Sequence, residues 1–279
     1  MKIVFFTREG FEKNELFLYM YARVRSQFPD CCIVSVNLRA ECRSVRNSLR
    51  KHCNKIRRLG WRQAAEVLSS YPLQLYFAER ANRERTRLLR NLPRPAVELE
   101  QPVTIVHSVN GADAVDAIRR LRPDVIIQAG AGILKPQIFR LASIACLNMH
   151  HGIAPLIRGM NSIYWGLWER RPEWVGSTIH EIDAGIDTGN VLAYAPVAER
   201  RPGEGFARLF VRATELGIDR LLEVLARLQA GERWSVPPLS GASVYRSTIS
   251  GWKLAALAWR LRGEREFLSG QGSHQTARS

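Results

Sequence analysis

The sequence predicts an α/β fold: a doubly wound, mostly parallel sheet with a helical insertion and a small C-terminal annex. Two observations carry this prediction. Apart from one basic segment, short apolar runs alternate with amphipathic runs over residues 1–200, which is typical of successive βαβ units. In addition, residues 125–128 (VIIQ) form an apolar run of the kind found at the centre of a parallel sheet.

The N-terminal residues predict a strand, a helix and a second strand. Residues 2–6 are mainly apolar and predict a buried strand. Apolar residues recur at near-helical spacing over residues 10–27, which predicts an amphipathic helix. Pro29 ends this helix, and residues 31–37 (CCIVSVN) predict the second strand.

The next segment departs from this alternation. It is rich in Arg and Lys, with scattered apolar residues. We expect two or three helices, broken near Gly60 and at Pro72, that form a basic insertion over about residues 39–93. The positive charge has two interpretations, a surface for a partner or a solvated amphipathic face.

Alternation resumes after the insertion. The predicted strands are residues 103–107, 125–128, 144–148 and 191–198, and the predicted helices are 112–121, a turn or helix within 133–141, an amphipathic helix within 205–231 and a basic helix at 252–262. The segment 234–245 contains two prolines and is predicted to be irregular. We assign residues 1–200 to the main domain, 201–268 to the annex and 269–279 to a disordered tail.

The overall charge favours anionic partners. Lys and Arg number 41 against 26 Asp and Glu, a formal charge of +15, which suits nucleic acid, phosphorylated metabolites or an anionic membrane surface. A solvated helical face explains the same excess. No long apolar run or signal peptide occurs, so we expect a cytoplasmic protein. The five cysteines form no CxxC pair, and we expect free thiols and no metal.

The chemistry is concentrated in residues 146–189. Asn148 and His150 are two residues apart on a predicted strand, so their side chains point the same way. Asp187 follows in a Gly-flanked loop, AGIDTG. An amide, an imidazole and a carboxylate together suit acyl transfer to an amine. The alternatives are a structural histidine, a turn-capping Asp187, or a metal site that includes His151. Adjacent strand residues face opposite ways, which argues against that metal site.

These residues resemble the signature of the folate-dependent formyltransferases, which include the glycinamide ribonucleotide, methionyl-tRNA and sugar N-formyltransferases. The matching positions are Asn148-Met149-His150, Pro155, Arg158-Gly159, His180 and Asp187-Thr188-Gly189. The resemblance covers roughly residues 103–197, including the run RPDVIIQAGAGILKP. It implies that residues 1–200 form a Rossmann-like catalytic domain.

The resemblance also implies roles for individual residues. The formyl donor would be 10-formyltetrahydrofolate. Asn148 would hold the formyl oxygen, His150 would stabilise the tetrahedral intermediate, and Asp187 would set the charge of the histidine and accept the amine proton. His180 would orient the Asp187 loop. The pterin would lie against the backbone of Gly130, Ala131, Gly132, Ile133 and Leu134, and against that of Ile182, Asp183, Ala184 and Gly185.

Two positions bear on the acceptor. His151 stands where the family usually has proline, so it is a candidate substrate contact. Arg158 is a candidate for a substrate phosphate or carboxylate, with a loop salt bridge as the alternative.

Four functions follow from these residues. The first is formylation of an amino sugar nucleotide or of a specialised-metabolite amine. The second is formylation of methionyl-tRNA, which the positive charge supports but the short chain after residue 197 disfavours. The third is hydrolysis of formyltetrahydrofolate. The fourth is a non-catalytic protein that binds a partner or a membrane surface through its basic helices. The sequence gives no oligomeric state.

Overall fold

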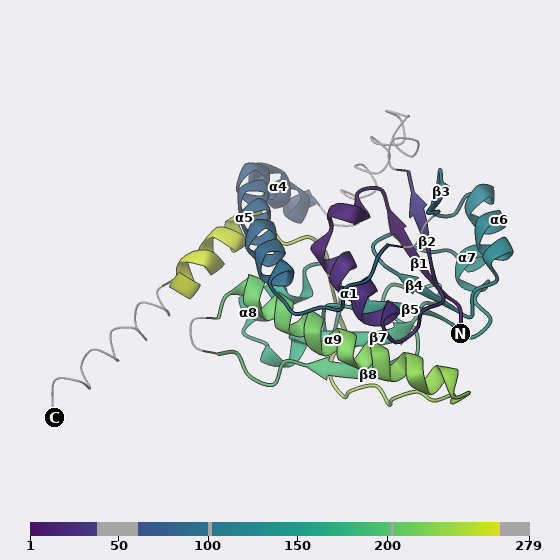
Figure 1. The fold of residues 1–279 in the computed structure, drawn as a ribbon. Helices are drawn as coiled ribbons and strands as arrows, with labels where there is room; N and C mark the ends of the chain where they lie inside the picture. The colour runs from purple at the N-terminus through teal and green to yellow at the C-terminus, as the bar shows by residue number, and fades with distance from the viewer. Residues whose placement is uncertain (38–60, 100–101, 202–203, 263–279) are drawn as a thin grey trace, which may run out of the picture.

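A seven-stranded sheet organises the chain. The computed structural model describes residues 1–37, 61–99, 102–201 and 204–262. The sheet has the order β3-β2-β1-β4-β5-β7-β8 (Figure 1). Its strands are β1 (Ile3–Arg8), β2 (Cys31–Val36), β3 (Thr104–Val106), β4 (Val125–Gln128), β5 (Ala145–His150), β7 (Gly176–Glu181) and β8 (Val191–Pro196). The first five strands in this list pair in parallel, and β7 and β8 add antiparallel strands at one side.

Helices cover both faces of this sheet. On one face lie α1 (Glu15–Arg25) and the long α9 (Phe206–Gln229), whose apolar side chains pack with Phe5, Ile127 and Ile179. On the other face lie α6 (Ala112–Leu121) and α7 (Pro136–Phe139), which pack with Phe6 and Ile126. Each central strand is therefore buried on both faces, which explains its unbroken apolar sequence.

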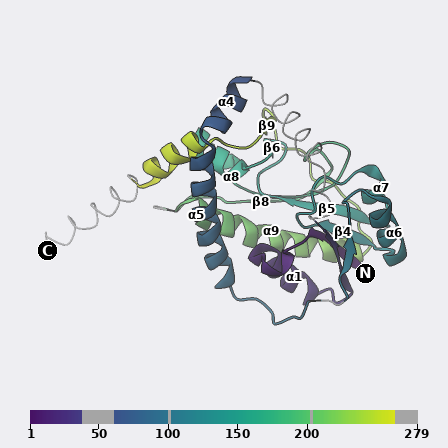
Figure 2. The ribbon, with the colours of Figure 1, turned by 90° about the horizontal axis from the view of Figure 1, so that it is seen from above.

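The basic insertion forms a helical arm beside the sheet. The described part of the insertion comprises α4 (Trp61–Ser69) and α5 (Tyr71–Arg90) (Figure 2). The buried carboxylate of Glu15 on α1 accepts hydrogen bonds from Arg90 Nε and Arg94 Nη1, each at 2.9 Å. Because these two ion pairs bridge separate segments, they fix α5 against the sheet domain.

A C-terminal helix over residues 251–262 completes the arm. Ser70 Oγ accepts a 2.9 Å hydrogen bond from the amide of Gly251, and Ser250 Oγ donates to Glu66 at 2.6 Å. Lys253 forms an ion pair with the same glutamate. The end of the described chain thus packs on the insertion and projects from the domain (Figure 1).

Two smaller strands and three short helical segments frame the rim of the sheet. The strand β6 (Ile157–Gly159) pairs in parallel with β9 (Val244–Arg246). The helical segments are η1 (Phe11–Lys13), α8 (Ser162–Glu169) and η2 (Pro172–Trp174). Within the described residues, no helix is both long and apolar enough to cross a membrane.

The predicted fold class is confirmed, with differences in detail. The prediction that residues 234–245 are irregular is wrong at the end of that segment, because Val244 begins the strand β9. The helix within 133–141 shortens to α7, and Pro72 lies in the first turn of α5, where proline is tolerated. The predicted break near Gly60 and the predicted tail lie outside the described residues. The proposed boundary at residue 200 stays a prediction, and α9 beyond it shares the core of the sheet.

Candidate active site

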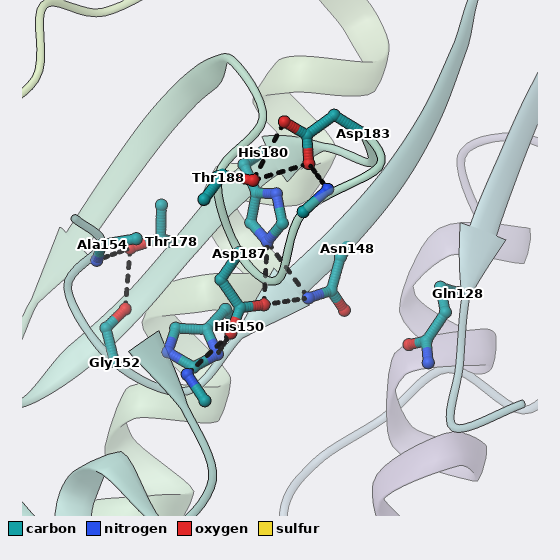
Figure 3. A network of polar contacts seen from close by, with 12 residues as sticks. Gln128, Asn148, His150, Gly152, Ala154, Thr178, His180, Asp183, Asp187 and Thr188 are labelled. Atoms are coloured by element: carbon teal, nitrogen blue, oxygen red, sulfur yellow. Dashed lines mark hydrogen bonds and ion pairs between the residues drawn. The ribbon is translucent and has the colours of Figure 1, made fainter. Parts of the chain in front are cut away.

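Three polar side chains lie in a row across adjacent strands. The register pairs Gln128 of β4 with Asn148 of β5, and Asn148 with His180 of β7. Directly opposite residues share a face of a sheet, so the three side chains point the same way (Figure 3). His150 follows on that face because β5 continues to residue 150. The row lies at the carboxyl ends of the parallel strands, where ligands bind in open α/β sheets.

Asp187 enters this row from the loop after β7. Its backbone adopts the left-handed conformation, with φ of 51°. Its carboxylate lies 3.4 Å from His150 Nδ1 and 3.5 Å from His180 Nε2. The amide of Gly159 donates to Oδ2 at 2.9 Å. The side chain of Asp187 is 12% exposed, so these contacts, rather than water, satisfy most of its charge.

Electrostatics set the protonation of the pair. Burial alone raises the pKa of Asp187, but the contact with His180, the charge of His150 and the Gly159 amide outweigh it and lower the pKa to about 2. For His150, burial is the largest effect and lowers the pKa, although the charge of Asp187 opposes it. The effect of burial outweighs that of the carboxylate, so near neutral pH a neutral His150 faces an ionised Asp187.

His180 fixes the orientation of Asn148. His180 Nδ1 lies 2.8 Å from the carbonyl oxygen of Glu181, which can only accept, so Nδ1 carries the proton. Nε2 then accepts a hydrogen bond from Asn148 Nδ2 at 3.1 Å. Asn148 Nδ2 also donates to Asp187 Oδ1 at 3.4 Å. Both amide hydrogens of Asn148 are therefore engaged, the second in a long and weak contact.

A tight loop supports the other side of His150. Ser162 Oγ lies 3.2 Å from His150 Nε2. A Cβ atom on Gly152 would lie 2.7 Å from both that nitrogen and the Cβ of Ser162, so only glycine fits there. The hydroxyl of Thr178 donates to the Gly152 carbonyl at 2.7 Å and accepts from the Ala154 amide at 3.0 Å (Figure 3). The loop is thereby tied to β7.

These side chains line a pocket of about 590 Å³. Its wall includes Asn148, His150, His180 and Asp187, together with the loops that follow β4 and β7. The pocket joins a donor amide, a neutral base and a carboxylate in a partly desolvated space, which suits acyl transfer to a nucleophile. Among the described residues, no group of three or more His, Cys, Asp or Glu could hold a metal ion.

Comparison with known proteins finds similarity to formyl transferases. Residues 78–208 match the formyl transferase family model. A methionyl-tRNA formyltransferase of Kosmotoga olearia is 32% identical over 150 residues, 53% of this chain and 48% of that protein. The chain is therefore similar in sequence to formyl transferases over residues 78–208. It spans about half the length of the curated relatives that it matches.

Solved structures share the fold of this chain. HypX from Aquifex aeolicus, solved in complex with tetrahydrofolic acid, aligns with a TM-score of 0.52 at 15% identity, covering 90% of this chain and 30% of that chain. A 4-N formyltransferase from Francisella tularensis aligns with a TM-score of 0.51 at 14% identity, covering 88% of this chain and 76% of that chain. At these identities the match concerns the fold alone.

Most residues predicted to face the folate of a formyltransferase do line the pocket. Those in its wall are Gly132, Ile133, Leu134, Ile182, Asp183 and Gly185, whereas Gly130, Ala131 and Ala184 lie outside it. Gly130 and Gly132 have positive φ angles, and no atom lies within 4 Å of a Cβ built on either. The backbone there is open to a ligand. Ile133 and Ile186 are 66% and 37% exposed and give this wall an apolar surface suited to an aromatic ring.

The two candidate acceptor residues are placed differently. His151 lines the pocket, stacks on Phe210 with ring centroids 4.2 Å apart, and contacts Thr214 Oγ1 through Nε2 at 2.9 Å. Arg158 is not in the pocket wall, and its Nε donates to Ser243 Oγ at 3.0 Å. The structure therefore brings His151, but not Arg158, to the cluster at the end of β5.

The sequence did not single out several residues of the pocket. Gln128 donates to the Gly132 carbonyl at 3.0 Å and so shapes the loop after β4. Ser162 is the first residue of α8, and its hydroxyl contacts His150. Arg85 reaches the pocket from α5. Gln128 had a usable signal, a polar residue at the end of an apolar strand. Arg85 had none, because its place depends on how the insertion docks.

Proposed function

We propose that this protein transfers a formyl group from 10-formyltetrahydrofolate to a primary amine. The observation that carries the proposal is the convergence of Asn148, His150 and Asp187 in one pocket of a chain that matches the formyl transferase family. The amine nitrogen bonds to the formyl carbon, and the bond from that carbon to folate N10 breaks. The amine loses one proton and N10 gains one, so the reaction needs no further reactant.

Each residue has a chemical task in this proposal. Asn148 donates a hydrogen bond to the formyl oxygen as negative charge develops there. To do so it exchanges its weak 3.4 Å contact with Asp187 for one with the substrate and keeps its contact with His180. His150 is neutral and can receive a proton, while the ionised Asp187 stabilises the resulting imidazolium. His180 is a positioning residue that holds Asn148 and Asp187 together.

The pocket walls fit the donor. The open backbone at Gly132 and the exposed apolar side chains of Ile133 and Ile186 offer amide groups and a flat apolar surface. A pteridine ring presents the complementary polar edge and aromatic faces. We assign residues 1–200 to the catalytic unit and residues 201–268 to an annex that supports it.

A screen of amines tests the proposal. Purified protein is incubated with 10-formyltetrahydrofolate and each amine, and the release of tetrahydrofolate is followed. We expect amine-dependent release that is lost in His150→Ala. Release without an amine, accompanied by formate, would instead support a hydrolase. Absence of release with every amine and with water contradicts both activities.

The acceptor remains open between two classes. An amino sugar nucleotide or other small metabolite is our first choice. Methionyl-tRNA is the second, because the curated relatives include methionyl-tRNA formyltransferases and the formal charge is +15. Binding of tRNA releases counterions, so its affinity should fall steeply with added salt. A gel-shift titration with initiator methionyl-tRNA at two salt concentrations separates the two classes.

A further inference from the structure

One cation of the pocket wall, Arg85, forms no ion pair with any carboxylate of the described residues. Arg85 projects from α5 into the wall that also holds Phe206, Phe210 and His151. Its guanidinium carbon lies 4.5 Å from the centroid of the Phe210 ring, and its Nη2 donates to Asn82 Oδ1 at 2.8 Å. The aromatic contact covers one face of the guanidinium, and Asn82 fixes its rotation. The remaining N–H groups have no hydrogen-bond partner within the described residues.

Two other arginines of the same helix form ion pairs. Arg83 pairs with Glu79 at 3.1 Å and Arg90 pairs with Glu15 at 2.9 Å. Within the described part of the chain, no carboxylate forms an ion pair with Arg85. Burial lowers the pKa of Arg85, yet arginine stays charged in proteins. A partly buried charge without a partner is costly, and the fold retains it at the pocket wall.

Arg85 and the proposed folate wall come from opposite sides of the sheet. The loop at Ile133 is tied to Asn110, which precedes α6, by a 2.9 Å hydrogen bond to its carbonyl. The helix α5 packs instead beside α1 and α9, on the other face (Figure 1). The pocket spans both sides at the end of β5. Arg85 therefore faces the side of the pocket away from the proposed pterin wall, which is where we place the second substrate.

We propose that Arg85 binds an anionic group, a phosphate or a carboxylate, on the amine acceptor. This rests on the proposed function and deepens it, because it names the class of acceptor. The planar guanidinium presents parallel N–H donors that match two oxygens of either group. Phe210 and Asn82 preorganise the fork, so little side-chain entropy is lost when the anion arrives.

The test measures acceptor binding without formyl transfer. Protein saturated with tetrahydrofolate is titrated calorimetrically with glucosamine 6-phosphate and with glucosamine, and then with glycine and with glycinamide. Both members of a pair carry the same amine, and only the first member carries a phosphate or a carboxylate. The wild type should bind at least one anionic member more tightly than its neutral counterpart by about 10- to 100-fold, as expected for a charge-assisted contact. A preference within the first pair indicates that Arg85 binds a phosphate, and a preference within the second pair indicates a carboxylate.

Three variants decide whether Arg85 is the cause. Arg85→Met keeps the apolar stem and should abolish the preference, whereas Arg85→Lys keeps the charge and should retain part of it. Arg83→Met, on the exposed side of the same helix, should leave it unchanged. The assignment is overturned if the wild type binds both members of each pair with equal affinity, or if the preference survives in Arg85→Met. A preference that depends on Arg85 without any formyl transfer overturns the proposed function but leaves the anion site standing.

Discussion

The Nδ1 atom of His150 lies 3.4 Å from Oδ2 of Asp187, and both side chains are largely shielded from solvent. One residue ends the strand β5, and the other sits in the loop after β7. The backbone amide of Gly159 holds the same Oδ2 atom at 2.9 Å. A neutral imidazole can receive a proton, and the ionised carboxylate beside it stabilises the imidazolium that forms, which is the property that the proposed reaction requires.

Asp187→Asn should remove activity while the fold is kept. Asparagine has nearly the same size and tolerates the left-handed backbone at this position, but it cannot stabilise a protonated His150. We expect kcat to fall by about 10²- to 10⁴-fold, measured by tetrahydrofolate release. Asp219→Asn, at an exposed ion pair with Arg23, is the matched control. Near-normal turnover by Asp187→Asn would falsify the role of the carboxylate.

Gly152→Ala tests the packing around His150. The added methyl group would lie 2.7 Å from His150 Nε2 and from Ser162 Cβ, so the imidazole must move. A misplacement of about 1 Å can cost on the order of 100-fold in rate. Circular dichroism should show an intact fold, while steady-state kinetics should show a lower kcat. Unchanged kinetics would mean that the position of the ring does not limit the reaction.

Protonation of His151 should make stability depend on pH. Burial, with the charges of His150 and Arg85, lowers its pKa from 6.5 to about 3. Between these values the unfolded chain binds a proton that the folded chain does not, so the free energy of unfolding decreases as pH falls from about 6.5 towards 3. The slope from one such group reaches about 1.4 kcal/mol per pH unit.

His151→Gln removes this titration and can still donate to Thr214, its partner in the structure. Urea unfolding at several pH values between 4 and 7 should therefore show a shallower decline for the variant than for the wild type. Parallel curves for the two proteins would contradict the prediction.

Glu15→Gln tests how α5 is held. Burial alone raises the pKa of Glu15, but Arg90 and Arg94 outweigh this effect and lower it. The ionised carboxylate therefore stabilises the fold above the unfolded pKa of about 4.3, and this contribution is lost as pH falls below that value. We expect a loss of about 3 kcal/mol at pH 7 that shrinks in acid. Glu79→Gln, at an exposed i,i+4 pair with Arg83, should cost at most about 0.5 kcal/mol. Equal losses in thermal or urea unfolding would count against a special role for Glu15.

Local sequence patterns were sufficient for the sheet and for the central site. Two residues of one strand and one Gly-flanked carboxylate were predicted to converge, and Asn148, His150 and Asp187 do so. The reason is physical: side-chain alternation is fixed by strand geometry, and parallel strands bring their carboxyl ends to one edge. Neither rule needs knowledge of distant contacts.

Other features depend on contacts that no local pattern encodes. Each strand of the β6–β9 pair has three residues, too few to show a period. Arg85 lies 125 residues before Phe210 of α9, its neighbour in the pocket wall. The lowered pKa of His150 comes from burial, which, unlike a neighbouring carboxylate, cannot be read from a motif.

The pairing of β6 with β9 links the carboxylate to a late part of the chain. Gly159 holds Asp187, and Arg246 stands opposite Gly159, with its carbonyl accepting a 2.8 Å hydrogen bond from Met160. During synthesis, the residues that carry the chemistry leave the ribosome well before this brace exists. The nascent polypeptide can therefore form its sheet early, but its reaction centre gains its final geometry only once residue 246 has emerged.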